Sequence, residues 1–404
     1  MTTRGRLFVG VGILIAVLGM GLGLLDLTKV GSLLVVLPVL AALLIRRPLA
    51  LEVNRSLSPS RIPIDGHSDV TLSVHNTGRA TSPILRGEER LAYALGDRPH
   101  LLVPRLRGDE VRSLHYRVRS HARGHHTIGP LMIRVSDPFG LATRSMSIPG
   151  QIALVVLPKT VPLLPVRGVP GGGGGETASS PRMALHGEDD VGVREYRFGD
   201  DLRRIHWRST ARTGETMVRQ DEEPTRRRAL VVLDDRMSVH AGTGSGGSFE
   251  WSVSAAASVT TRLLSERFEV HLFLASDASG QVVPLEGIDH VLDHLAAVQP
   301  SKVTSPQHIL EALDDFGQHG GGLVVGILGA MDGEDAEVCA LRTKNGAALV
   351  IDRGGFVGSS ASSDSAQATA LRLSQGGWRT AVVHPGDQLP GLWEQLMVGR
   401  TVRT

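Results

Sequence analysis

One stretch of the chain gathers most of the residue types that catalyse reactions. Residues 187–228 hold ten acidic and ten basic side chains in forty-two positions, about half charged against 21% for the whole sequence. Within it, Asp200 precedes His206 at a spacing that would let a carboxylate orient an imidazole as a general base. Ser209 is the nearest hydroxyl downstream of that histidine. One hypothesis is therefore a hydrolase or transferase that uses His206 with Asp200.

The same charges also fit a structural network. They balance, whereas a nucleic-acid groove needs surplus Lys and Arg, so we expect no nucleic-acid binding. The sequence predicts a helix beginning at Gly199–Asp201, with a carboxylate on its first free amides. Arg203, His206 and Trp207 would then lie three and four positions apart, so imidazole and indole would hold the guanidinium. We favour this network, which would fix the packing of the stretch, over the enzyme.

The stretch resembles a known signature, R-x-Y-x-x-G-D-x-x-R-x-I-H-W-x-x-x-A-R, of the bacterial domain-of-unknown-function family 58 (DUF58). The matching positions are Arg194, Tyr196, Gly199, Asp200, Arg203, Ile205, His206, Trp207, Ala211 and Arg212. Two upstream phrases, Arg123-Gly124 followed by IGP and then Asp137–Leu141 (DPFGL), are also similar to this family. Proteins of the family resemble those encoded beside MoxR-type AAA+ ATPases. The resemblance therefore implies a membrane adaptor or partner of such an ATPase in envelope or complex assembly.

A second group of polar residues lies after an apolar segment, Ala229–Asp234. The order of elements resembles a von Willebrand factor A domain, whose metal-ion-dependent adhesion site begins D-x-S-x-S and adds a Thr and an Asp from later loops. Matching residues would be Asp234, Ser238, Thr304 and Asp332, whereas Arg236 stands where the pattern has Ser. The resemblance implies a degenerate adhesion-type site that binds a metal or a partner protein.

Two hypotheses about Arg236 stay open. Mg²⁺ prefers oxygen ligands, and a guanidinium both removes one and repels the ion, by about 4 kcal/mol for unit charges 4 Å apart at an effective dielectric of 20. The site either still binds Mg²⁺, or Arg236 replaces the ion by pairing with Asp234 or with a carboxylate of a partner. No other cofactor is expected.

The elements that must position these residues alternate between strands and helices after Arg228. Apolar strand-like runs occur at 229–234, 268–275, 323–328, 347–351 and 380–384, with a short one near Val282. Helical segments are predicted at 251–266, 290–298 and 307–316. This alternation predicts an α/β domain with a mostly parallel sheet, whose ligands bind beyond the carboxyl ends of the strands. The resemblance described above implies that this domain is von Willebrand A-like (Rossmann-type).

Residues 49–160 have a different pattern. Short alternating runs such as VTLSVHN and LMIRVSD, bounded by turn residues, predict an antiparallel, immunoglobulin-like β-sandwich of about seven strands. His121, His125 and His126 could suggest a metal. Because ligation needs three or four converging groups and no Cys or acidic partner has suitable spacing, we interpret them as solvent-facing strand residues.

The amino-terminal residues are apolar enough for a membrane. Leu7–Leu25 holds nineteen residues without a charge and Val30–Ile45 sixteen more, which predicts a transmembrane hairpin. A signal peptide is the alternative, but the first run is long for one and a second run follows. Four arginines flank the two spans, which places both ends and the soluble domains in the cytoplasm of a multi-pass cell-membrane protein. They are Arg4, Arg6, Arg46 and Arg47.

The chain of 404 residues is long enough for several domains. Its formal charge of +2 implies no electrostatic partner, and its single Cys339 excludes an intrachain disulfide. A Gly-rich run lacks the Lys of a phosphate-binding loop and is interpreted as a linker. The predicted parts are a hairpin (1–48), a sandwich (49–160), a linker (161–186), a charged arm (187–228) and an α/β domain (229–404). We expect a non-catalytic, membrane-anchored protein-interaction module, with a structural scaffold whose arm rests on anionic lipid as a further alternative.

Overall fold

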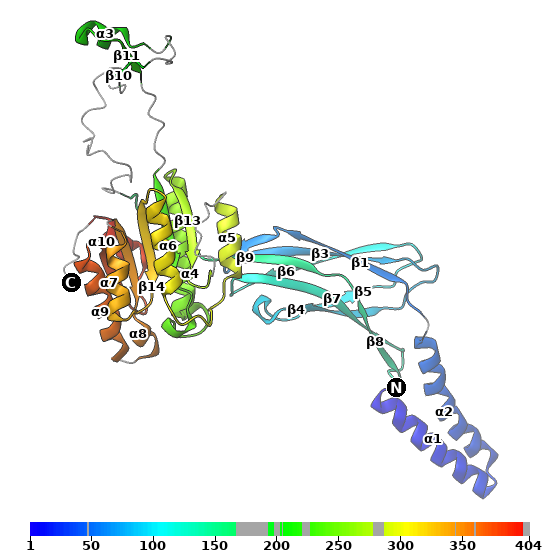
Figure 1. Ribbon diagram of the computed structural model, residues 1–404. Coiled ribbons are helices and arrows are strands. Elements are labelled where there is room, and N and C mark those ends of the chain that lie inside the picture. The colour runs from blue at the N-terminus through cyan, green and yellow to red at the C-terminus, as the bar shows by residue number, and fades with distance from the viewer. Residues whose placement is uncertain are drawn as a thin grey trace. The chain divides into compact units, whose positions relative to one another are not determined.

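The computed structural model describes most of the chain. The described residues are 1–46, 48–166, 193–197, 203, 205–219, 227–277, 287–343, 345–358 and 361–398. They fall into two compact units, each considered by itself (Figure 1). One comprises Met1–Lys159 with Leu292–Val298, and the other Thr160–Val291 with Gln299–Thr404.

Two apolar helices begin the first unit, α1 (Thr3–Leu22) and α2 (Leu25–Ile45). Both are long and apolar enough to cross a membrane, as the sequence predicted. Small residues allow them to touch, because a Cβ added at Gly31 would lie 2.4 Å from the backbone nitrogen of Ala16. The helix α1 ends at Gly23, whose φ of 71° is left-handed and closes the turn into α2. Of the four flanking arginines, Arg47 lies outside the described residues.

Two sheets form the sandwich that follows. The smaller has the order β1-β3-β6 and the larger β2-β9-β7-β4-β5, with β8 paired to β7. The strands are β1 (Leu51–Ser58), β2 (Arg61–Pro63), β3 (His67–Asn76), β4 (Leu85–Leu91), β5 (His100–Val103), β6 (Val111–Arg119), β7 (Gly124–Ser136), β8 (Thr143–Ile148) and β9 (Ile152–Leu157). The predicted number of about seven was too low, because β2 and β5 are too short to show alternation. The pairing is antiparallel as predicted, except that the short β2 pairs parallel with β9.

The sandwich core comes from the alternating faces of its strands. Leu72 and Val74 of β3 pack against Leu131 and Ile133 of β7 in one buried cluster that spans both sheets. The predicted histidines lie at its surface, where His121 bonds Asp65 through Nδ1 at 2.8 Å. Within the described residues no group of three His, Cys, Asp or Glu side chains is placed to hold a metal.

One ion pair is buried in this core. Arg55 Nε donates to Glu89 Oε1 at 2.9 Å, and both side chains are almost fully shielded from solvent. Arg55 Nη2, Glu89 Oε2 and the hydroxyl of Tyr116 find no hydrogen-bond partner among the described residues. Burial raises the pKa of Glu89, which the charge of Arg55 opposes, and burial also raises the pKa of Tyr116.

The second unit is built on a five-stranded parallel sheet of order β13-β12-β14-β15-β16. Its strands are β12 (Arg228–Leu233), β13 (Glu269–Leu274), β14 (Leu323–Leu328), β15 (Gly346–Ile351) and β16 (Arg379–Val383). All five occur where the sequence predicted a strand, whereas the one expected near Val282 lies outside the described residues. Their long apolar runs are typical of strands covered on both faces.

Helices cover both faces of this sheet. The helices of this unit are α4 (Ser248–Ser265), α6 (Gln307–Gln318), α7 (Gly333–Leu341), α8 (Arg353–Val357), α9 (Ala361–Gln375) and α10 (Leu389–Val398), while most of α5 (Ile288–Ala297) belongs to the first unit. Leu230 and Val232 of β12 pack with α6, α7 and α9, while α4 contacts β12 and β13 and contributes nothing to that cluster. The lone Cys339 is buried in α7, and burial raises its pKa to about 12.

The start of the predicted linker lies on this unit. The indole of Trp393 donates to the carbonyl of Leu164 at 2.9 Å, and Val161 N donates to Ser258 Oγ at 3.0 Å. Residues 161–166 are therefore held by the α/β unit, which corrects the predicted beginning of the linker at 161. The rest of it, 167–186, lies outside the described residues.

Candidate functional site

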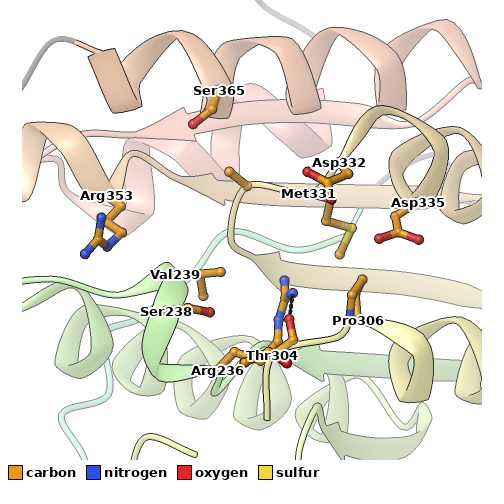
Figure 2. Close-up of a pocket in the computed structure, with 11 residues that line it drawn as sticks. Arg236, Ser238, Val239, Thr304, Pro306, Met331, Asp332, Asp335, Arg353 and Ser365 are labelled. Carbon is orange, nitrogen blue, oxygen red and sulfur yellow. Dashed lines mark hydrogen bonds between the residues drawn. The ribbon is translucent and has the colours of Figure 1, made fainter. Parts of the chain in front are cut away.

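A pocket of about 320 Å³ lies over the carboxyl ends of the parallel strands. The chain passes from β13 on one side of β12 to β14 on the other, so the strand order reverses between β12 and β14. Loops that leave neighbouring strands in opposite directions at such a point open a crevice, where ligands of doubly wound sheets bind. The lining residues come from the loops after β12 and β14, from the segment before α6 and from α7, α8 and α9 (Figure 2).

A buried ion pair forms the floor of the site. Arg236 binds Asp234 with two parallel hydrogen bonds, Nε to Oδ1 at 2.8 Å and Nη2 to Oδ2 at 2.7 Å. Its Nη1 donates to the backbone carbonyl of Thr304 at 3.0 Å (Figure 2). Asp234 also accepts from the amide of Gly329 at 3.0 Å, so its carboxylate joins the loops after β12 and β14. The pairing of Arg236 with Asp234 is one of the two arrangements that the sequence left open.

Neighbouring polar groups brace this pair. His240 Nε2 bonds the carbonyl of Asp234 at 2.6 Å, and Asp235 Oδ1 accepts from the amide of Ser276 at 2.9 Å. Burial lowers the pKa of His240 and raises that of Asp235. Burial also opposes the charge of Arg236, but hydrogen bonds and attraction from Asp234 outweigh it, and the pKa of the guanidinium is raised.

The donor set does not fit Mg²⁺. Both oxygens of Asp234 accept from the guanidinium, and that group carries a positive charge where an ion would need a hydroxyl. Thr304 presents its backbone carbonyl to Arg236. Ser238 and Asp332 are exposed in the pocket, so the structure brings all five predicted residues together around a guanidinium.

Three polar residues of the pocket were missed by the sequence reasoning. Asp335 lies one turn into α7, Arg353 begins α8 directly after β15, and Ser365 comes from α9. A systematic search of residues that follow each predicted parallel strand would have found Arg353. Arg353 Nε donates to the carbonyl of His240 at 3.3 Å. Asp332 and Asp335 make one part of the lining acidic, whereas Arg353 makes another part basic (Figure 2).

The charged arm has its own small fold. The strands β10 (Val193–Glu195) and β11 (Met217–Arg219) pair antiparallel, and α3 (Trp207–Thr213) precedes β11. The predicted helix would include Ile205 and His206, but α3 begins only at Trp207, because Ile205 forms a bridge with Val218 and the amide of His206 bonds Met217. Gly199 and Asp200 lie outside the described residues.

His206 is the cap of this helix. Its Nδ1 accepts from the backbone amide of Ser209 at 3.2 Å and lies 2.8 Å from that residue's Oγ. Arg203 precedes the helix and Trp207 is its first residue, 70% exposed, so Arg203, His206 and Trp207 do not lie within one continuous helix as predicted. The hold of the imidazole and the indole on the Arg203 guanidinium stays a prediction. The other signature residues lie nearby in the chain: Arg194 in β10, Tyr196 after it, and Arg212 in the last turn of α3. The amide of Tyr196 bonds Thr216, which ties the two strands.

Solved structures that resemble the chain cover small parts of it. The CARDB domain of a Pyrococcus furiosus protein, solved with di-metal ions, is 16% identical over 25% of this chain and 90% of that one, with a TM-score of 0.19. The alkylpurine DNA glycosylase AlkC of Pseudomonas fluorescens, bound to DNA with an abasic site analog, is 11% identical over 31% and 39%, with a TM-score of 0.17. These low scores add nothing to the description of the fold.

A family model gives the more specific result. None of the curated proteins matches this chain. The model described as "Protein of unknown function DUF58" matches residues 192–346. That range holds the arm signature, the pair Arg236–Asp234 and the first three strands of the parallel sheet. The match supports the DUF58 family indicated by the signature, a family defined as of unknown function.

Proposed function

We propose that this protein is a membrane-anchored, non-catalytic protein-interaction module that binds its partner at the strand-end pocket. The observation that carries the proposal is the locked pair Arg236–Asp234 beneath exposed, oppositely charged lining residues. The guanidinium of Arg236, whose charge Asp234 neutralises, forms a rigid floor. The exposed Asp and Arg side chains above it match the polar rim of a protein interface.

The proposed partner is an AAA+ ATPase of the MoxR type. This follows from the resemblance of the arm and of the α/β unit to proteins encoded beside such ATPases. Because the pocket carries both signs of charge, we expect a partner segment that presents a basic side chain to Asp332 and Asp335 and an acidic one to Arg353.

The pull-down that tests this proposal uses the whole chain in detergent as bait in lysate. Asp335→Lys reverses a charge inside the pocket, whereas Glu337→Lys reverses one on the same helix two residues away, on the opposite side. We expect mass spectrometry to find a MoxR-type ATPase with wild type and Glu337→Lys, and to lose it with Asp335→Lys. Equal recovery with all three baits would place the contact elsewhere, and no ATPase with any bait would refute the partner.

The proposed location is the cell membrane, with both units in the cytoplasm. The helices α1 and α2 would form a two-span hairpin whose ends carry Arg4, Arg6 and Arg46, as the positive-inside rule requires. A tag after Thr404 should resist protease added to intact spheroplasts and be digested after lysis. Digestion from outside would contradict this orientation.

A hydrolase is the second candidate, because Ser209 Oγ lies 2.8 Å from a ring nitrogen of His206. That distance is the one a general base needs to activate a hydroxyl. However, the same nitrogen also accepts the amide of Ser209, as a helix cap does. A fluorophosphonate probe that labels wild type, but neither Ser209→Ala nor His206→Ala, would favour the hydrolase. Labelling independent of both residues would exclude it.

A further inference from the structure

The DPFGL phrase forms the tight turn between β7 and β8. Asp137 locks it, because Oδ2 accepts from the amide of Phe139 at 3.0 Å and Oδ1 from that of Ala142 at 2.6 Å. Gly140 has a φ of 68°, a left-handed conformation that favours glycine. The turn is therefore rigid, and the direction of its central side chain is fixed by the backbone.

This turn holds the first residues of α1. Thr2 N donates to the carbonyl of Leu141 at 3.0 Å, and Thr2 Oγ1 donates to that of Gly140 at 2.7 Å. The same hydroxyl accepts from the amide of Gly5 at 3.1 Å and so caps the helix. A Cβ at Gly5 would lie 2.2 Å from the oxygen of Leu141, so the approach requires a glycine there. The amino-terminal end of α1 is thus attached directly to the turn.

The last residues of α2 meet the same turn. Arg144 Nη1 donates to the carbonyl of Arg46 at 3.1 Å. Leu141 and Ala142 are buried in a cluster with Ala41, against which Ile45 also packs. Both helix ends are therefore fastened to one β-turn within the first unit.

Phe139 is a large apolar residue of this turn that lies outside that cluster. It is 67% exposed, although it lies two positions from Leu141, which is 2% exposed. If α1 and α2 cross a bilayer, their two held ends mark the level of its surface, and the turn that carries Phe139 lies at that level. The same helix ends carry Arg4, Arg6 and Arg46. Aromatic side chains beside basic ones are typical of segments that bind at the headgroup boundary.

We propose that Phe139 inserts into the headgroup region of the bilayer and that the DPFGL turn seats the β-sandwich on the membrane. The proposal rests on the membrane anchoring proposed above and adds a second, peripheral contact to it. Since the turn is locked by Asp137 and fastened to both helices, the side chain would enter the lipid without any rearrangement. The bilayer would then hold the sandwich at a defined orientation instead of leaving it on a tether.

The test places an environment-sensitive fluorophore at single cysteines in the full chain, reconstituted in nanodiscs. Phe139→Cys is the test position and Tyr93→Cys the control, because Tyr93 is fully exposed in the same unit. Tyr93 belongs to the opposite end of the sandwich, where Ala94 bonds His121, about 40 Å along the thirteen-residue β7 from the turn. Cys339 is buried, and unsubstituted protein shows how much label it takes up.

We expect emission at position 139 to shift to the blue and to be quenched by lipids with a nitroxide near the headgroup. The probe at position 93 should show neither effect. A position-139 probe that behaves like the control, or one that is shielded without lipid quenching, overturns the inserted phenylalanine. Flotation of the unlabelled protein with liposomes distinguishes failure of the proposed membrane anchor from failure of the proposed turn contact. Flotation without quenching refutes the turn contact alone, whereas failure to float refutes the membrane anchor and the turn contact together.

Discussion

Two buried pairs of arginine and carboxylate differ in how completely they use their polar atoms. In the α/β unit, Arg236 and Asp234 form two parallel hydrogen bonds, and the remaining contacts go to Thr304 and Gly329. In the sandwich, Arg55 and Glu89 share one hydrogen bond of 2.9 Å, and each keeps a polar atom without a partner among the described residues. Both pairs are shielded from solvent to a similar degree.

The difference in hydrogen bonding shows which of the two buried ion pairs is built to support a binding site. Removing two ions from water costs several kcal/mol each, which only good geometry and further hydrogen bonds repay. The pair Arg236–Asp234 meets this condition and joins two loops at the floor of a pocket. The pair Arg55–Glu89 does not meet it and lies in an otherwise apolar core. We therefore expect the first to stabilise its surroundings and the second to be replaceable.

The largest effect should follow from Asp234→Ala. This change leaves Arg236 buried without its counterion and takes the acceptor from the amide of Gly329. We expect a loss of about 3–5 kcal/mol in the free energy of unfolding. Tryptophan fluorescence during urea unfolding measures it selectively, because all four tryptophans lie outside the sandwich. The exposed Asp332→Ala is the control and should change the value by less than about 0.5 kcal/mol. A similar small change for Asp234→Ala would remove the distinction between the pairs.

Replacing both partners of each pair should change the free energy of unfolding in opposite directions for the two pairs. The double change Arg55→Met with Glu89→Leu removes two buried charges and two polar atoms that lack a partner, so the sandwich should be unchanged or gain about 1–4 kcal/mol. The matching change in the α/β unit, Asp234→Leu with Arg236→Met, should still be destabilising, because the amide of Gly329 loses its acceptor. Hydrogen exchange of strand amides measures each unit separately. Equal outcomes in both units would contradict the comparison.

Glu89 and His240 should give pH dependences of stability with opposite signs. Burial raises the folded pKa of Glu89 above its ordinary 4.5, so the stability linked to it is present below 4.5 and is lost as pH rises through the folded value. Burial lowers the folded pKa of His240 below 6.5, so its contribution is present above 6.5 and is lost as pH falls through the folded value. Each slope is at most about 1.4 kcal/mol per pH unit. The stability of each unit, measured by hydrogen exchange, should depend less on pH in Glu89→Gln for the sandwich and in His240→Gln for the α/β unit. An unchanged pH dependence would refute the role given to that residue.

The smallest effect should be that of Mg²⁺ on the wild type. Because the guanidinium of Arg236 occupies the oxygens of Asp234, millimolar Mg²⁺ should not shift the melting temperature. Arg236→Ser restores D-x-S-x-S from Asp234 to Ser238, and its melting temperature should rise with Mg²⁺ although it starts lower. A calcium- and magnesium-free buffer with chelator is the reference. A shift in the wild type that Asp234→Ala abolishes would restore the metal hypothesis.

The sequence predicted the parallel sheet well for a physical reason. The run Leu323–Leu328 is buried at every position, and such uninterrupted apolar runs are distinctive. Shorter strands carry less signal, so Arg61–Pro63 was missed. The helix of the arm was placed too early, because a pairing between Ile205 and Val218, thirteen residues apart, competed with the local capping pattern.

The site was predictable as a set of residues but not as an arrangement. The pattern from Asp234 to Ser238 indicated the right loop, yet it fitted either an ion or an ion pair. The choice depends on where Thr304 and Gly329 place a carbonyl and an amide, seventy and ninety-five positions further along the chain. Arg353 entered the pocket from a third element that carries no motif.

Glu266 gives the arm a property that its own residues do not reveal. Its carboxylate accepts from the amide of Val166 at 3.0 Å, and its backbone carbonyl accepts from Arg227 Nη2 at 3.2 Å. Val166 and Arg227 thus meet at one residue, so the stretch between them, which includes the arm, joins two neighbouring points of the α/β domain. Excising this stretch and closing the gap with a few glycines should leave the domain folded, since halving a loop saves only about 0.6 kcal/mol of closure entropy.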